Sequence, residues 1–264
     1  MTQHTLNHTV YNSMAEYGAS QVSPLETIDS NPNEYIQLVN IVKSHFPDMT
    51  NKEVNDFLQK LKDEGCAYVA MINSLFDEFI HNRIQFKELF GFDIVSEDGT
   101  LNYNHVLVDL YCKMDNHNRR RFLFFTWDTY SKNEDKVLYE NEDGKMEWRT
   151  KPYGNTAIQI KHRWETYCKH YGIKVKVKIT LFVTPKNYKK QAKKGSVCIL
   201  CSNFTLYDDN GTSTHIKGGH FMIITDVTPD QKYVVSSWGK RYTLDPNDIK
   251  GFVHYQVIQY KKRG

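Results

Sequence analysis

Apolar residues recur three and four positions apart along much of the chain before residue 172, which is the spacing of one helix face. After Thr50, for example, Val54, Phe57 and Leu61 form such a face. The pattern predicts helices at residues 33–45, 50–64, 66–82, 104–113 and 155–171, with a shorter amphipathic piece at 86–90.

Two adjacent predicted helices carry signals at their ends. Thr50 followed by Glu53 is a capping box, in which each side chain satisfies a backbone N–H at the start of a helix. Gly65 is expected to end that helix in the permissive, left-handed conformation of a C-terminal cap. The next helix is then expected to begin at Cys66.

The period changes at Ile173, where apolar and polar residues begin to alternate. Alternation with turn signals between the runs is typical of β-strands. The predicted strands are residues 173–183, 196–205, 220–227, 233–237 and 253–260.

A helical first half followed by a strand-rich second half predicts an α+β protein. We expect residues 1–48 to be an N-terminal arm with a short helix. Residues 49–264 are expected to be one unit, with a helical lobe at about 49–172 and a β lobe at about 173–264. Within the helical lobe, Asp98-Gly99 marks a turn, residues 116–154 are polar and irregular, and Phe122–Phe125 is expected in the core.

Composition indicates a globular protein with a hydrophobic core, since 40% of the 264 residues are hydrophobic and 13% are aromatic. No apolar run approaches the length of a membrane span, about 18 residues. The first residues lack the pattern of a secretory signal. We therefore expect a cytoplasmic chain, or one exported by a route that needs no such signal.

Charge and cysteine usage narrow the functions further. The net charge is +3, and lysines alternate with apolar residues from Ile173 to Ile179. This alternation favours the solvated face of a strand over a nucleic-acid surface. The five cysteines are scattered, so no disulfide framework is expected. Cys198 and Cys201 are expected on opposite faces of one strand, so neither a metal nor another cofactor is predicted.

One cysteine has a context that suits chemistry. A thiol reacts as its thiolate, which a helix N-terminus and a neighbouring imidazolium both favour. Cys66 is predicted at a helix start, and His220 is predicted to open a strand after Gly218-Gly219. Ser236, at the end of the next strand, is predicted to return alongside His220 and orient its ring.

These segments resemble those of papain-like cysteine peptidases. Gly65-Cys66-Ala67, Gly219-His220-Phe221 and Ser236-Ser237-Trp238-Gly239 occur in the family's order. The first two also resemble double-glycine leader peptidases and the papain-like domains of bacterial toxins and effectors. The resemblance implies a central nucleophile helix packed on a C-terminal antiparallel β-sheet. It also implies a catalytic set of Cys66, His220 and Ser236.

Two positions depart from the family pattern. Ser236 stands where the family has an orienting asparagine, so Asp226 and Ser237 remain alternatives for that role. The family's oxyanion glutamine has its nearest candidate in Gln59, and the backbone N–H of Cys66 is a further donor.

The resemblance implies a thiol hydrolase, a peptidase or an amidase, with a peptide or protein as substrate. If the chain is a bacterial toxin or effector, a cognate inhibitor or immunity protein is an expected partner. The alternative is a catalytically inactive papain-like module that binds a peptide or a partner protein.

Overall fold

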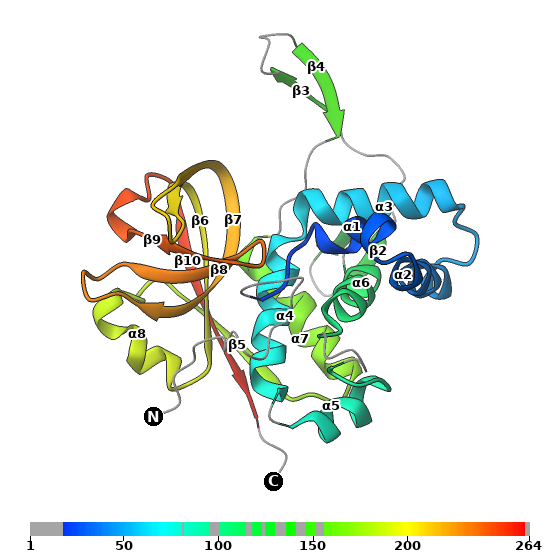
Figure 1. Ribbon diagram of the computed structural model, residues 1–264, viewed down its shortest axis with the longest axis horizontal. Helices are drawn as coiled ribbons and strands as arrows, with labels where there is room; N and C mark the ends of the chain where they lie inside the picture. Colours follow the sequence, from blue (N-terminus) through cyan, green and yellow to red (C-terminus); the bar gives the residue numbers. More distant parts are fainter. Residues whose placement is uncertain are drawn as a thin grey trace.

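The structure is a computed structural model that describes residues 18–80, 82–95, 101–114, 118–122, 125–129, 136–140, 146–150 and 156–261. Most of its helices lie on one side of the central helix and its main sheet, with one short helix, on the other (Figure 1). The described part is therefore α+β, as the change of sequence period predicts.

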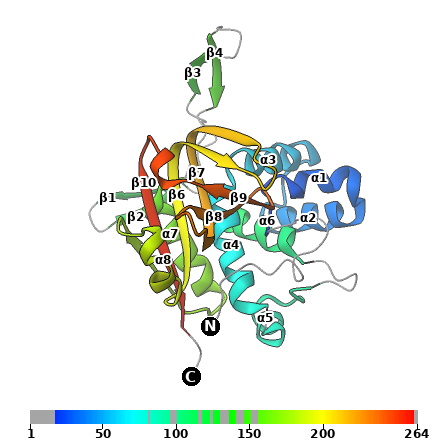
Figure 2. The same cartoon turned by 60° about the vertical axis from the view of Figure 1, so that its left-hand side comes forward.

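The helices pack mainly on one side of the molecule (Figures 1 and 2). Each predicted helix is present, with its ends shifted by at most three residues. The helices are α1 (Ser23–Ser30), α2 (Pro32–His45), α3 (Asn51–Glu64), α4 (Cys66–Phe79), α5 (Arg83–Phe90), α6 (Tyr103–Met114), α7 (Ala157–His170) and α8 (Pro185–Ala192).

The main sheet has six antiparallel strands in the order β5-β10-β6-β7-β8-β9. The end of β6 also pairs with β9, so strands β6 to β9 close on one another. The strands are β5 (Val175–Thr180), β6 (Ser196–Tyr207), β7 (Ser213–Val227), β8 (Tyr233–Ser237), β9 (Lys240–Leu244) and β10 (Val253–Tyr260).

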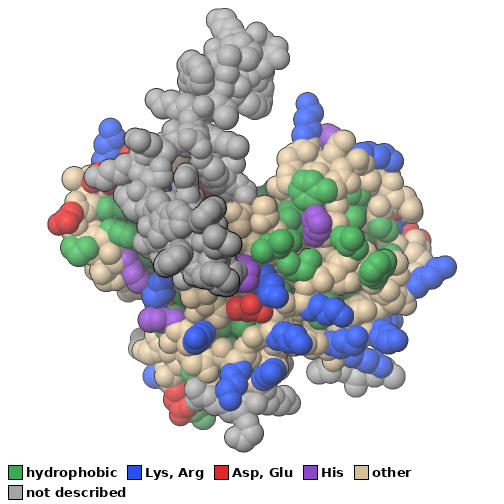
Figure 3. Space-filling model, turned by 180° about the vertical axis from the view of Figure 1, so that it is seen from behind, with side chains coloured by type: hydrophobic (Ala, Val, Ile, Leu, Met, Phe, Trp, Pro, Cys, Tyr) green, Lys and Arg blue, Asp and Glu red, His purple; other side chains and the backbone are tan. Residues whose placement is uncertain are grey.

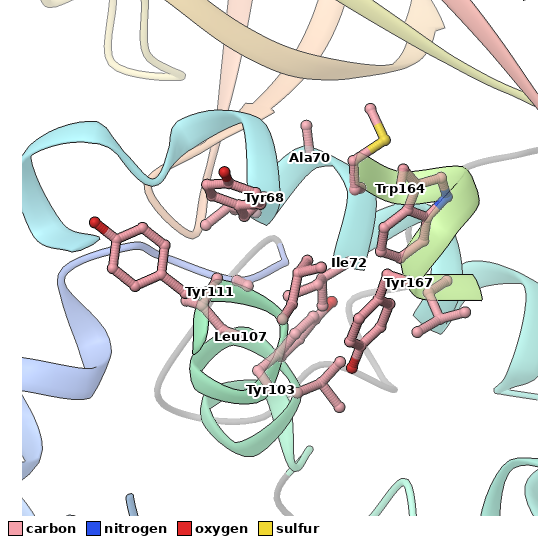
Figure 4. Close-up of a cluster of buried hydrophobic side chains, with 14 of the residues drawn as sticks. Tyr68, Ala70, Ile72, Tyr103, Leu107, Tyr111, Trp164 and Tyr167 are labelled. Carbon is pink, nitrogen blue, oxygen red and sulfur yellow. The ribbon is translucent and has the colours of Figure 1, made fainter. Parts of the chain in front are cut away.

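Helix α4 lies between the other helices and the sheet because it is apolar almost all round. On one side Tyr68 and Ile72 meet Tyr111 of α6 and Trp164 of α7 (Figure 4). On the other side α4 meets the outer face of the sheet, where Phe221 and Ile223 of β7 join the same core. A second core lies on the opposite face of the sheet.

The faces of β6 follow the two-residue period of a strand. Cys198 belongs to the core beneath α4, whereas Cys201 belongs to the second core. The prediction that these two cysteines lie on opposite faces is confirmed.

Gly65 separates α3 from α4 for a reason other than the predicted one. Its φ is −75° and its ψ is 0°, so the expected left-handed conformation is wrong. A Cβ at this position would lie 2.4 Å from the carbonyl oxygen of Leu61. Only glycine therefore fits against the last turn of α3 where the chain passes into α4. The capping box of Thr50 and Glu53 is confirmed.

Several elements were not predicted. Helices α1 and α8 and strand β9 each have eight residues or fewer, so their periodic signal is weak. Residues 116–154 were predicted irregular, yet they contain β1 (Asn118–Phe122) paired with β2 (Phe125–Thr129), and β3 (Lys136–Glu140) paired with β4 (Met146–Thr150). The predicted turn at Asp98-Gly99 and the core position of the Phe122–Phe125 side chains lie outside the described residues.

Asp109 of α6 ties three helices together. Its carboxylate accepts hydrogen bonds from Tyr167 of α7 at 2.9 Å and from Tyr171, which follows α7, at 2.6 Å; it also lies 3.1 Å from His45 of α2. Lys113 forms an ion pair with it at 3.0 Å. Burial raises the pKa of Asp109, but the Tyr171 hydrogen bond and the Lys113 charge outweigh burial and hold the pKa below its usual value.

Candidate functional site

Cys66 is the first residue of α4, at the junction between the helices and the sheet. It is half-buried, whereas the other four cysteines are buried. Its sulfur faces the backbone N–H groups of Phe221 and Ala67 as well as its own. The predicted helix-start context of Cys66 is confirmed, and its neighbour in β7 directly follows His220.

The thiol is protonated in this arrangement. Burial raises the pKa of Cys66, and Glu64 adds a smaller effect in the same direction. The backbone N–H groups of Phe221 and Ala67 lower the pKa but do not outweigh burial. The resting state of Cys66 is therefore a thiol.

His220 lies within β7, not at its start as predicted. The strand begins at Ser213, and its first seven residues are largely exposed. His220 is the first buried position and pairs with Cys201 of β6. The register shifts just beyond this pair, between Ser202 and Phe204. Such bulges re-aim side chains next to many active sites.

The His220 ring is held by two neighbours. Its Nε2 lies 2.7 Å from the hydroxyl of Ser237, and the Trp238 ring stacks on it with centroids 4.5 Å apart. Burial lowers the pKa of His220 to about 4, so the imidazole is neutral at neutral pH. Because Nε2 is committed to Ser237, Nδ1 is the nitrogen left to receive a proton from a thiol.

A two-residue turn sets the position of Trp238. Strand β8 ends at Ser237 and β9 begins at Lys240, so Trp238 and Gly239 form the hairpin loop. Both have positive φ, 48° and 71°, as a type I′ turn requires. Positive φ is strained for a side chain as large as tryptophan. Here the strained residue is the one that covers His220.

Ser236, the predicted orienting residue, faces the other way. It pairs with Ile223 in the sheet, and its hydroxyl accepts a hydrogen bond from Asn73 of α4 at 3.4 Å. The contact with Nε2 of His220 belongs instead to Ser237, one of the two alternatives. The cause is strand alternation, which places consecutive side chains on opposite faces.

Asp226, the other alternative, lies six residues along β7 from His220, a separation of about 20 Å at the rise of a strand. Its carboxylate accepts a hydrogen bond from the N–H of Val227. Its position therefore does not suit orientation of the His220 ring.

Gln59 lies away from the site. It is exposed on α3 and donates to Asp63 at 3.1 Å. A different glutamine lies beside the start of α4: Gln21 is buried, and a Cβ on Gly65 would be 3.2 Å from its Cβ. Its amide donates to the carbonyl of Lys62 at 2.7 Å. No local sequence pattern links Gln21 to Cys66.

The segment from Gly18 to Val22, which includes Gln21, runs beside the start of α4 and the β8–β9 turn. The N–H of Ala19 donates to Asn73 at 2.9 Å, and its carbonyl accepts from the N–H of Gly239 at 3.1 Å. It thereby joins α4 to the turn that carries Trp238. This part of the predicted N-terminal arm is therefore docked against α4 and the β8–β9 turn.

Cys66 lies against Phe221, the residue that follows His220 in β7. Among the described residues no hydrogen bond joins Cys66 and His220. His220 shares its strand face with Met222 of the second core, whereas Phe221 faces α4. The thiol therefore meets the backbone of β7 next to His220.

No group of three or more His, Cys, Asp or Glu side chains suited to a metal ion occurs in the described ranges. Across those same residues, no helix has both the length and the apolar character needed to cross a membrane. The sequence matches no family model and no curated protein.

Proposed function

We propose that the protein is a papain-like, cysteine-dependent hydrolase that cleaves a peptide bond or a side-chain amide. The observation that carries the proposal is the junction of α4 with β7. There Cys66, half-buried at the start of α4, lies beside Phe221 of β7. The residue before Phe221 is His220, whose ring is buried, neutral and held by Ser237 and Trp238.

In the proposed reaction, the Cys66 sulfur attacks the carbonyl carbon of the substrate while its proton passes to Nδ1 of His220. The C–N bond then breaks, and His220 returns the proton to the departing amine. Water, deprotonated by His220, hydrolyses the thioester and restores the thiol. Because no bond joins Cys66 and His220 at rest, substrate binding has to bring the ring within reach of the sulfur.

The negative charge on the carbonyl oxygen needs preorganised donors. The N–H groups of Cys66, Ala67 and Phe221 already face the sulfur and are the nearest donors. Gln21, next to Gly65, replaces Gln59 as the candidate side-chain donor. Its amide carries two hydrogens, of which one bonds the carbonyl of Lys62.

The second candidate function is a catalytically inactive module that binds a peptide or partner protein. The observation in its favour is electrostatic. Burial raises the pKa of Cys66 and lowers the pKa of His220 to about 4, so both charged forms are disfavoured at rest. A role as a bacterial effector with an immunity protein rests on the sequence resemblance alone.

Turnover separates the two functions. Release of dye from labelled casein and release of ammonia from glutamine-containing peptides report peptidase and amidase activity. We expect Cys66→Ala to abolish turnover. Cys198→Ala, which alters a buried cysteine of β6 beneath α4, should retain it. Full turnover by Cys66→Ala would overturn the nucleophile assignment, and stoichiometric peptide binding without turnover would favour the inactive module.

A further inference from the structure

The chain contains a long stretch with lysines and no acidic residue. Glu165 is followed by no Asp or Glu until Asp208, and nine lysines lie between them. No arginine occurs between Arg163 and Arg241. The stretch covers the end of α7, strand β5, helix α8 and all of β6.

The fold turns most of these lysines to solvent. On the edge strand β5, Val177 is buried and Lys176 and Lys178 are exposed. On α8, Tyr188 and Ala192 pack into the second core, so the lysines of that helix face outward. The exposed lysines of this surface are Lys174, Lys176, Lys178, Lys186, Lys189, Lys190, Lys193 and Lys194.

Within the part of the chain that the structure describes, no ion pair neutralises these lysines. Across the described ranges, the ion pairs involve Lys60, Lys87, Lys113, Lys232 and Arg241, and none involves a lysine of this surface. Seen from behind, blue side chains gather along the lower part of the β-rich side with few red ones among them (Figure 3). The surface therefore presents uncompensated positive charge.

Two bulky apolar side chains lie within this lysine-rich surface. Leu181 and Phe182 follow β5 directly and are 57% and 79% exposed. Lys178 and Lys186 flank them in the chain. Phe252, 49% exposed, precedes β10 at the same end of the sheet, since Tyr255 pairs with Thr180. Green side chains lie just above the blue ones in Figure 3.

We propose that this surface, defined by the eight lysines with Leu181 and Phe182, docks on an anionic phospholipid bilayer. Lysines beside an exposed apolar tip match a bilayer boundary, where headgroups carry negative charge and acyl chains accept the tip. A nucleic-acid surface is disfavoured because it gains most from arginine, which this stretch lacks.

Docking there would bring the candidate site close to the bilayer. A Cβ on Gly219 would lie 3.3 Å from the Phe252 ring, and Gly219 precedes His220. The docking proposal stands without the proposed hydrolase, because charge and apolar exposure alone carry it.

Cosedimentation of the full chain with vesicles tests the proposal. We expect binding to vesicles of 70% phosphatidylcholine and 30% phosphatidylserine, weak binding to pure phosphatidylcholine, and a steep loss with added salt. Lys189→Glu with Lys190→Glu should lower partitioning roughly 20-fold or more. Phe182→Ser should lower it about tenfold.

Matched controls make the outcome specific. Lys52→Glu with Lys62→Glu alters two exposed lysines of α3, and Ile84→Ser removes a side chain that is 77% exposed, close to the value for Phe182. Both controls should bind as the unaltered protein does. Equal binding by all variants, or no preference for anionic vesicles, would overturn the proposal. Displacement of the protein from vesicles by single-stranded RNA would also overturn the proposal, if Phe182→Ser binds that RNA as well as the unaltered protein does.

Discussion

Acidification should weaken the fold through His220, and the size of the effect follows from its burial. Burial lowers the pKa of this histidine from 6.5 to about 4. Between these values the unfolded chain binds a proton that the folded chain does not. The stabilisation from the neutral ring is therefore complete above pH 6.5 and is lost as the pH falls toward 4.

The depression of the pKa corresponds to about 3 kcal/mol of unfolding free energy over the whole window, of which about 2 kcal/mol is lost by pH 5. Urea unfolding at pH 7.5, 6 and 5 measures this directly. We expect the unaltered protein to lose about 2 kcal/mol more than His220→Gln between pH 7.5 and 5. Comparison with the variant cancels the contributions of other titrating groups, such as His105, to the pH dependence of the unfolding free energy.

His215→Gln is the matched control, because His215 lies on the same strand but is exposed. It should follow the pH dependence of the unaltered protein. Equal losses for the unaltered protein and His220→Gln would show that His220 does not titrate as a buried neutral ring. The argument for its resting state as a neutral base would then fail.

Two substitutions test other parts of the account. Asp109→Asn should lower the unfolding free energy by about 2–4 kcal/mol, since it leaves buried donors around α6 without their carboxylate. Asp93→Asn, at an exposed ion pair, should change the unfolding free energy by less than about 0.5 kcal/mol in the same urea titration. Equal effects of the two substitutions would contradict the role of Asp109. Ser237→Ala should lower kcat more than tenfold, and Ser237→Thr should restore it. Ser236→Ala should lower kcat less in the same turnover assay. A larger loss of kcat in Ser236→Ala than in Ser237→Ala would return the orienting role to Ser236.

The sequence predicts the elements better than the contacts between them. Hydrophobic period and the Thr50 capping box suffice for α3 and α4, because both signals act within one helix. The α+β class follows from the change of period at Ile173. Gly65 was correctly identified as a break, but the need for glycine comes from the packed junction, where a Cβ would meet the Leu61 carbonyl in the last turn of α3 and the side chain of Gln21.

The site depends on relations that cross the chain. Choosing between Ser236 and Ser237 requires the register of β7 against β8, because a shift of one residue reverses the face. The two-residue loop at Trp238-Gly239 fixes only the register of β8 against β9. Gln21 lies more than forty residues before Cys66 and reaches it only through packing.

Covalent trapping tests the central claim, that Cys66 is a nucleophile served by His220. A panel of peptidyl vinyl sulfones is incubated with the full chain at pH 7, and adducts are located by peptide mass mapping. The account predicts an adduct on Cys66 and a rate at least about 100-fold lower in His220→Gln, the size of general-base assistance. Modification of Cys66 at the same rate in both proteins would contradict it.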